Sequence, residues 1–332
     1  MTTTPAIDHI PARELMVIKD LTVGYGTNIL FENLNLALLA GELVCFMGPN
    51  GAGKSTLIRS MGGLQKPMSG EVILHNSEYG GMEKNIAMVL TDPVRDVNMT
   101  VAEIVAFGRY PYLGWNVSLR NIDKELVSVS IQKVGIEHLA NRKLHELSDG
   151  QLQMTMIAKA LAQDTPIIIL DEPTAHLDLN NRVEIMRLLR GLAKDTKKAI
   201  LIATHELDLA LQTADVIWLS GRRKNIIRGI PEDLVLDGSF DETFAFKGFD
   251  LKTGRVQHQQ YQQMPIIFTG AGYYYLWTMN ALERNGYTVS AQGQGYRISL
   301  SAGASGTVWE CQDGKIFSTI SELLVYLRTL SN

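Results

Sequence analysis

The sequence predicts an α/β protein in which a largely parallel sheet presents a phosphate-binding loop. Segments 167–170 and 199–203 are apolar on both faces, as is typical of central strands in a parallel sheet. A glycine-rich segment, residues 48–56 with the sequence GPNGAGKST, lies between an apolar strand and a helix. A stretch of helical periodicity at about residues 93–165 separates the strands, which indicates an inserted helical subdomain.

The glycine-rich segment fits the pattern G-x-x-x-x-G-K-[ST]. Glycines let backbone N–H groups close around phosphate oxygens, and the next helix directs its positive N-terminus at the same anion. We expect Lys54 to neutralise the β- and γ-phosphates of a nucleoside triphosphate and the Ser55 hydroxyl to ligate Mg²⁺. The candidate nucleotide ligands are Gly48, Pro49, Asn50, Gly51, Ala52, Gly53, Lys54, Ser55 and Thr56.

Length and composition limit the function classes. A chain of 332 residues exceeds one ordinary core, so two domains are expected. The net charge of −4 argues against a nucleic-acid partner, because such binding normally requires a basic surface. The two cysteines have no metal or redox spacing and indicate a reducing compartment. No apolar run reaches the length of a membrane helix, and the polar start lacks a signal-peptide core, so a soluble chain is expected.

The first elements of the chain are short strands. Residues 15–23 alternate like an edge strand and lead into a turn at residues 24–26. Tyr25 in this turn either packs locally or stacks on a purine. Further strands are expected at residues 30–38, 43–47 and 71–75, with a helix at residues 54–61.

The helical stretch follows a buried strand, residues 85–90, that ends at Thr91 and Asp92. Its helices are expected at residues 100–109, 121–135 and 148–163. The sequence Ser148-Asp149-Gly150-Gln151 has the capping-box form S-x-x-Q. One interpretation is a well-capped helix, and the other is an anion site at unobstructed N–H groups. The spacing alone does not decide between them.

Two acidic residues, Asp171 and Glu172, end the buried strand at residues 167–170. Adjacent buried carboxylates are costly unless a cation accompanies them. Asp171 is therefore a candidate Mg²⁺ ligand, and Glu172 could polarise the water that attacks the γ-phosphate. The alternative is a helix N-cap before Pro173.

A histidine, His205, lies just beyond the strand at residues 199–203. A lone histidine is commonly structural. This one follows the carboxyl end of a parallel strand, as do Gly48, Asp92 and Asp171, and ligands bind at that edge of α/β sheets. The strand at residues 216–220 and a second at 225–228 then form a hairpin.

The motifs GPNGAGKST, LSDGQ, IIILDEPTAHLD and ATHE, in this order, resemble those of ATP-binding cassette (ABC) ATPases over residues 15 to about 240. The resemblance implies that Tyr25 stacks on adenine, Glu172 is the catalytic base and His205 is the switch histidine. It implies a homodimer that holds two ATP molecules between its subunits. The residues that complete the partner's site would be Ser148, Gly150, Gln151 and, as a link between sites, Asp178.

Two positions depart from the family pattern. Asp92 stands where the family usually has glutamine, so its approach to Mg²⁺ or to the attacking water is a weaker expectation. Asp149 replaces the second glycine of the signature, and Ser148 and Gly150 remain in place.

The aromatic segment 108–115 and the form PTAHLD, with His176, resemble importers of the iron-siderophore, haem and cobalamin type. This implies an ATPase subunit under two permease subunits on the cytoplasmic face of the inner (plasma) membrane, served indirectly by a substrate-binding protein. Rival hypotheses are an ATPase for another substrate, a cassette protein acting on DNA or ribosomes, and a sensor that binds ATP without hydrolysing it. The direction of transport depends on the membrane partner.

The last ninety or so residues lack a nucleotide motif, metal spacing or nucleophile arrangement. We expect an ATPase domain at residues 1–245, a linker at 246–264 and a small α+β domain at 265–332. Strands are expected at residues 266–269, 288–291, 296–300, 307–311 and 315–318, and helices at 273–285 and 321–330. By analogy, this module regulates the ATPase or supports its dimer.

Overall fold

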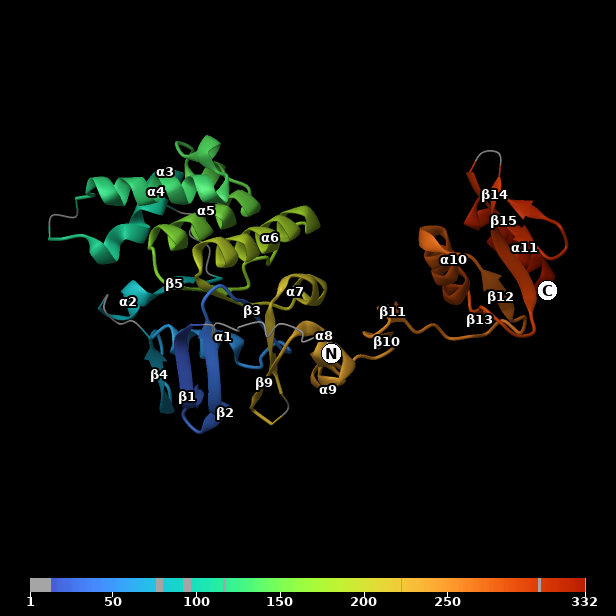
Figure 1. Cartoon of the computed structure of the whole chain (residues 1–332), viewed down its shortest axis with the longest axis horizontal. Helices are drawn as coiled ribbons and strands as arrows, with labels where there is room; N and C mark the ends of the chain where they lie inside the picture. The colour runs from blue at the N-terminus through green and yellow to red at the C-terminus, as the bar shows by residue number, and fades with distance from the viewer. Residues whose placement is uncertain are drawn as a thin grey trace, which may run out of the picture. The chain divides into compact units, whose positions relative to one another are not determined.

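The computed structural model describes residues 13–75, 80–91, 97–115, 118–221, 223–303 and 306–331. The chain divides into two compact units, Met1–Ala245 and Phe246–Asn332, whose elements are labelled in Figure 1. Within the described residues, no helix combines the length and apolar character needed to cross a membrane. Each unit has its own hydrophobic core, so each is described by itself.

The first unit contains a six-stranded sheet with the strand order β5-β6-β7-β3-β8-β9. The first five of these strands run parallel, and β9 is antiparallel to β8. Strands β3, β6, β7 and β8 are buried throughout, which explains their continuous apolar sequences. The strands are β3 Leu43–Met47, β5 Ile86–Val89, β6 Ile167–Asp171, β7 Ala199–Ala203, β8 Val216–Ser220 and β9 Ile226–Gly229.

A smaller antiparallel sheet has the order β2-β1-β4, formed by β1 Glu14–Tyr25, β2 Asn28–Leu39 and β4 Ser69–Leu74. Strand β1 is its central strand, so the expected edge position was wrong. Besides β2, strand β1 also pairs with β4, which lies more than fifty residues further along the chain; Val17, for example, pairs with Ile73. Tyr25 is the last residue of β1, and the turn itself begins at Gly26.

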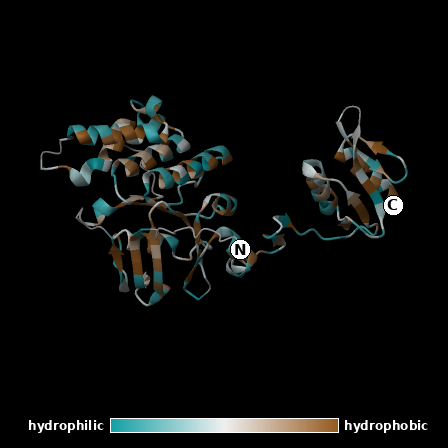
Figure 2. Cartoon of the chain, in the orientation of Figure 1, coloured by the Kyte–Doolittle hydropathy of each residue, from teal (hydrophilic) through white to brown (hydrophobic). Residues whose placement is uncertain are grey.

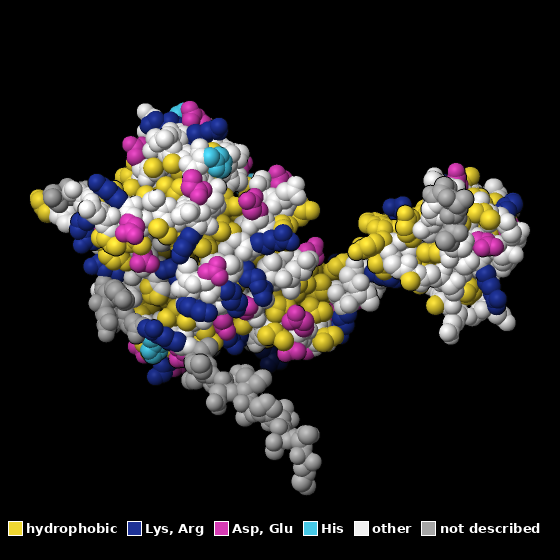
Figure 3. Space-filling model, turned by 45° about the horizontal axis from the view of Figure 1, so that its top comes forward, with side chains coloured by type: hydrophobic (Ala, Val, Ile, Leu, Met, Phe, Trp, Pro, Cys, Tyr) yellow, Lys and Arg dark blue, Asp and Glu magenta, His cyan; other side chains and the backbone are white. Residues whose placement is uncertain are grey.

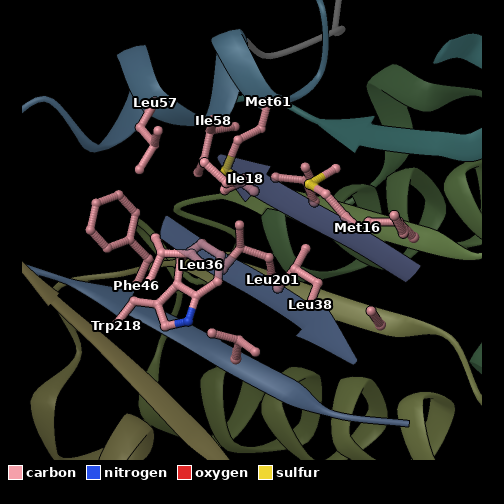
Figure 4. Close-up of a cluster of buried hydrophobic side chains, with 14 of the residues drawn as sticks. Met16, Ile18, Leu36, Leu38, Phe46, Leu57, Ile58, Met61, Leu201 and Trp218 are labelled. Atoms are coloured by element: carbon pink, nitrogen blue, oxygen red, sulfur yellow. The ribbon is translucent and has the colours of Figure 1, made fainter. Parts of the chain in front are cut away.

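The core of the first unit lies between this small sheet, the parallel sheet and helix α1, Lys54–Met61 (Figure 4). Met16 and Ile18 of β1 face Ile58 and Met61 of α1. Phe46 of β3 meets the ring of Trp218 of β8, 6.4 Å between ring centroids. The helix that follows the phosphate-binding loop is therefore anchored by apolar side chains on its inner face.

The inserted helical subdomain consists of α3 Val101–Ala106, the 3₁₀ helix η2 Phe107–Tyr112, α4 Asn121–Val134 and α5 Asp149–Ala162. Thr100 and Ser148 are N-caps with complete capping boxes, of which only the box at Ser148 was predicted. The α-helix expected over residues 100–109 ends at Ala106 and continues as 3₁₀ turns that include Pro111. Arg109 of η2 binds Asp123 of α4 at 3.0 Å and the Ala162 carbonyl of α5 at 3.0 Å, which ties the three helices together.

The remaining elements of the first unit connect or cover these sheets. Helix α6, Leu179–Thr196, packs its buried face, including Ile185, Met186 and Leu189, toward the parallel sheet. In Figure 2 the strands of the unit are predominantly hydrophobic and α6 is largely hydrophilic on its visible side. The other elements are α2 Met82–Asn85, η3 Glu137–Leu139, η4 Leu144–Glu146, α7 Leu207–Thr213, α8 Pro231–Leu236 and α9 Ser239–Phe244.

The second unit begins with a short hairpin, β10 Phe249–Asp250 and β11 Arg255–Val256, within the stretch expected as a linker. A five-stranded mixed sheet follows, with the order β13-β12-β14-β15-β16. Its core includes Phe268, Leu282 and Leu327, and the buried Trp309 Nε1 donates to the Thr278 hydroxyl at 2.7 Å. The elements are β12 Ile266–Thr269, α10 Gly272–Arg284, β13 Val289–Ser290, β14 Tyr296–Gly303, β15 Gly306–Cys311, β16 Ile316–Phe317 and α11 Ile320–Ser331.

Candidate functional site

The glycine-rich loop connects β3 to α1 at the carboxyl edge of the parallel sheet. Gly51 has φ 79° and Gly53 has φ 97°, both in the left-handed region that disfavours other residues. A Cβ on Gly53 would also lie 3.0 Å from Leu30 Cβ. The loop therefore needs glycine at Gly53 both for its backbone conformation and for its packing.

Lys54, the first residue of α1, is buried, and its side chain folds back onto the phosphate-binding loop. Its Nζ donates to the Gly48 carbonyl at 2.8 Å and to the Pro49 carbonyl at 3.3 Å. Burial lowers the pKa of Lys54, and the opposing effect of Glu172 and Asp171 favours the charged form. The ammonium group thus interacts electrostatically with Glu172, just after β6, and with Asp171, the last residue of β6.

Asp171 ends β6 and is 4% exposed. Its Oδ1 atom has no hydrogen-bond partner among the described residues, and the Thr91 hydroxyl donates only to its main-chain carbonyl, at 3.4 Å. A buried carboxylate oxygen without a hydrogen bond fits a hard divalent cation, which takes oxygen ligands. Ser55, the second oxygen donor that the sequence predicts for such a site, is exposed at the start of α1. Asp92 lies outside the described residues.

Glu172 and His205 meet across neighbouring strands β6 and β7. The distance from Glu172 Oε2 to His205 Nδ1 is 2.7 Å, and the His205 side chain is 55% exposed. Glu172 has φ 52°, and its N–H donates to the Ala203 carbonyl of β7 at 2.9 Å. The carboxylate and the imidazole therefore form a pair that opens to solvent beside the phosphate-binding loop.

Tyr25 lies at the end of β1 with its ring 55% exposed. Its hydroxyl is 3.2 Å from Thr56 Oγ1 on the first turn of α1. This contact places the exposed ring next to the loop, where it is available to stack on a flat ligand.

The predicted signature residues lie at the start of α5. Ser148 Oγ accepts from the Gln151 N–H at 3.3 Å, and the Ser148 N–H donates to Gln151 Oε1 at 3.1 Å. Gly150 is buried, and a Cβ there would lie 3.0 Å from Cγ of Asn181. Asn181 in turn binds the α6 N-cap Asp178 through its N–H at 2.9 Å and its Nδ2 at 3.0 Å. The structure thus brings Gly150 and Asp178 together through Asn181.

Sequence reasoning missed a second link, which joins the Asp178 loop to His205. Arg182 Nε donates to the Leu177 carbonyl at 2.6 Å, and Arg182 Nη1 is 2.8 Å from Glu206 Oε1. Glu206 Oε1 is also 3.8 Å from His205 Nε2. The available signal was an arginine one helical turn after an N-cap aspartate, together with an acid next to the candidate histidine.

These observations define a phosphate-loop protein that binds a nucleoside triphosphate at the edge of a parallel sheet. Residues 31–175 match the family described as ABC transporter, and residues 263–328 match the family described as iron ABC transporter C-terminal domain. The expected resemblance is therefore confirmed for the first unit, and the match of the second unit is to a family that the sequence motifs did not indicate. The chain belongs to the ATP-binding proteins of ABC transporters, of the iron-siderophore import type.

The chain aligns with most of the length of two curated relatives. The uncharacterised ABC transporter ATP-binding protein MJ0873 of Methanocaldococcus jannaschii is 36% identical over 260 residues, 74% of this chain and 90% of the relative. The petrobactin import ATP-binding protein FpuD of Bacillus anthracis is 38% identical over 222 residues, 65% of this chain and 81% of the relative.

Solved structures share the fold of the first unit. The protein cbiO1 of Clostridium perfringens, part of the ABC transporter complex cbiONQ, is 27% identical, with TM-score 0.59, 68% of this chain and 95% of that chain covered. The cassette MJ0796, a dimer bound to ADP and phosphate, is 28% identical, with TM-score 0.54 and 65% and 99% covered. ATPase subunits of this family dimerise and assemble with a permease.

Proposed function

We propose that two copies of this chain hydrolyse ATP at their shared interface and thereby power uptake of a ferric siderophore through a membrane permease. The observation that carries the proposal is the convergence of Lys54, Asp171, Glu172 and His205 at one sheet edge, in a chain with an iron ABC transporter C-terminal domain. The petrobactin importer subunit supports the siderophore as cargo. We place the dimer on the cytoplasmic face of the membrane, where the permease would meet it.

Each residue of the site has a distinct proposed task. Lys54 exchanges its two carbonyl partners for phosphate oxygens, so its charge is already in place when ATP binds. Glu172 accepts the proton of the attacking water, and His205, held at 2.7 Å, orients that carboxylate. Asp171 and Ser55 would hold Mg²⁺, which neutralises charge on the phosphates when bound. Tyr25 would stack on the adenine.

The partner copy completes the proposed site. Ser148 is exposed at the start of α5, where its capping box with Gln151 is formed, whereas the nearby Gly150 is buried against Asn181 of its own chain. In the dimer these residues would contact the ATP held by the loop of the other copy, and Asp178 would link the two sites. The dimeric MJ0796 cassette supports this arrangement.

The catalytic assignment is tested with the substitution Glu172→Gln. We expect ATP to bind and to stabilise the dimer, while turnover falls by about 10²–10⁴-fold, the contribution of a general base. ATPase assays and size-exclusion chromatography measure the two effects. Glu184→Gln, an exposed glutamate on α6, is the matched control and should hydrolyse ATP normally. Unchanged hydrolysis in Glu172→Gln would refute the mechanism.

The cargo is tested separately, with the chain reconstituted in liposomes with its permease. A ferric siderophore, haem and cobalamin are each supplied with a binding protein, and ATP hydrolysis is measured. We expect the ferric siderophore to raise the rate. A response to haem or cobalamin alone would contradict the cargo and leave the ATPase mechanism intact.

A further inference from the structure

Asn181 connects the starts of two helices that come from different parts of the first unit. It lies in the first turn of α6, three residues after the N-cap Asp178, and it packs against Gly150 in the first turn of α5. One side chain therefore joins the two segments that the proposed dimer directs toward ATP, the start of α5 and the Asp178 loop.

Asn181 binds both oxygens of the Asp178 carboxylate. Its N–H donates to Oδ1 at 2.9 Å, and its Nδ2 donates to Oδ2 at 3.0 Å. The first bond is the ordinary N-cap bond of α6, which the backbone provides whatever the side chain at this position. The second bond requires the carboxamide, and a carboxylate with both oxygens bound is held in one orientation. The side chain of Asn181 thus fixes the orientation of Asp178.

The same carboxamide limits which residue can occupy position 150. A Cβ on Gly150 would lie 3.0 Å from Asn181 Cγ, 3.1 Å from Oδ1 and 3.2 Å from Nδ2, closer than packed atoms at their optimal separation. The missing Cβ of Gly150 lets the carboxamide approach the first turn of α5. Because the Nδ2 atom beside Gly150 is the atom bonded to Asp178, a displacement of that turn changes the same hydrogen bond.

We propose that Asn181 is a positioning residue that transmits movement of the start of α5 to Asp178. The inference rests on the proposed function, in which the start of α5 contacts the ATP of the partner copy and Asp178 links the two sites. ATP that engages the start of α5 thereby sets the Asp178 carboxylate of the same chain. Asn181 itself has no contact with ATP in this arrangement, so it affects the turnover rate rather than ATP binding.

Two substitutions at Asn181 separate its hydrogen bond from its shape. Asn181→Ala removes the Nδ2 donor and should lower kcat for ATP by about 10-fold, the loss expected of one hydrogen bond to a charged group, with KM nearly unchanged. Asn181→Asp keeps the shape but places a second carboxylate beside Asp178, so its kcat should fall further. If the side chain served packing alone, Asn181→Asp would resemble the parent chain and Asn181→Ala would be the slower variant. That order would overturn the proposal.

Two controls are assayed in parallel with the full chain. Asn180→Ala, on an exposed neighbouring residue of α6, should keep the parent's rate. Glu172→Gln tests the proposed function itself. An active parent and an inactive Glu172→Gln, together with an unchanged kcat in Asn181→Asp, would count against Asn181 alone. A parent chain that does not hydrolyse ATP would overturn the proposed function and this inference with it.

The contact with α5 is tested by Gly150→Ala, alone and combined with Asn181→Ala. The added methyl group displaces the carboxamide in the single variant and meets no carboxamide in the double variant. The losses in kcat should therefore be non-additive, and additive losses would show that α5 does not act through Asn181. Urea denaturation shows whether each variant is folded. If Gly150→Ala does not fold, the order of the two Asn181 variants decides, because Asn181 is partly exposed and tolerates substitution better than a buried residue.

Discussion

Arg182 illustrates how one side chain can couple two loops at the site. It bonds the Leu177 carbonyl, just before Asp178, and the Glu206 carboxylate, just after His205. Both partners are largely shielded from solvent, with Glu206 16% exposed, so the pair is stronger than an ordinary surface ion pair. We infer that Arg182 positions His205 through Glu206, whose Oε1 lies 3.8 Å from His205 Nε2.

We predict that Arg182→Ala lowers kcat for ATP and leaves KM nearly unchanged, because no atom of Arg182 is assigned to ATP. The free energy of unfolding should fall by about 1–3 kcal/mol, since Glu206 loses its partner. Steady-state kinetics and urea denaturation measure these changes. In a double-mutant cycle with Glu206→Gln the two effects should be non-additive. Strict additivity would show that the two residues act separately.

At the scale of elements, the helical subdomain depends on a buried carboxylate. Asp123 of α4 is inaccessible to solvent and binds both Arg109 of η2 and Arg120 at the start of α4. Hydrogen bonds from Arg120, opposed by burial and reinforced by Arg109, lower the pKa of Asp123 from 3.8 to about 2. Because the folded-state pKa is the lower one, protonation favours unfolding.

The stabilisation by Asp123 should therefore be complete above pH 3.8 and be lost as the pH falls toward 2. Asp123→Asn should flatten the acid limb of the stability curve. It should also lower stability at neutral pH by about 3–5 kcal/mol, because Arg109 is left buried with its charge unpaired. Chemical denaturation between pH 2 and pH 7 measures both effects. An unchanged pH dependence in Asp123→Asn would contradict this account.

The sequence predicted elements whose local pattern determines them. Strands β6 and β7 are apolar on both faces, and Thr100 and Ser148 carry their own capping boxes. The position of β1 within its sheet was not predictable in this way. Its place depends on pairing with β4, and an alternating strand looks the same at an edge or in the centre when only its own residues are read.

The same limit applies to the site. The loop conformation follows from Gly51 and Gly53, because no other residue adopts their φ angles readily. The contact of His205 with Glu172 joins residues 33 apart, and that of Gly150 with Asn181 joins residues 31 apart through two different helices. Such pairings are set by the parallel strand order and by helix packing, which no short motif contains. The motifs predicted which residues belong to the site, and the fold determines which of these residues are in contact.

At the scale of the whole molecule, the two units have separate cores. The first is built around residues such as Phe46 and Trp218, and the second around Phe268 and Leu327. Exposed apolar side chains remain on the second unit, among them Tyr273 and Trp277 of α10; Figure 3 shows hydrophobic side chains on its surface. The ATPase core in the first unit is thus complete without residues of the second.

We predict two thermal transitions for the full chain in calorimetry, one per unit, because the described residues form a separate core in each unit. A chain that ends at Ala245 should keep the first transition at the same temperature, and a fragment that starts at Phe246 should keep the other. ATP should raise only the transition of the first unit, by mass action. A single cooperative transition, with both fragments unfolded, would contradict this independence.

Glu172 has a backbone conformation that is unfavourable for any residue with a side chain. A side chain at φ 52° crowds its own carbonyl, at about 1–2 kcal/mol, and glycine does not. Glu172→Gly should therefore unfold at a higher temperature than Glu172→Ala, the reverse of their usual order, and both should be inactive. Selection for folding stability alone would favour a glycine at this position. Under the proposed mechanism, the glutamate lowers folding stability at this position in exchange for a role in ATP turnover.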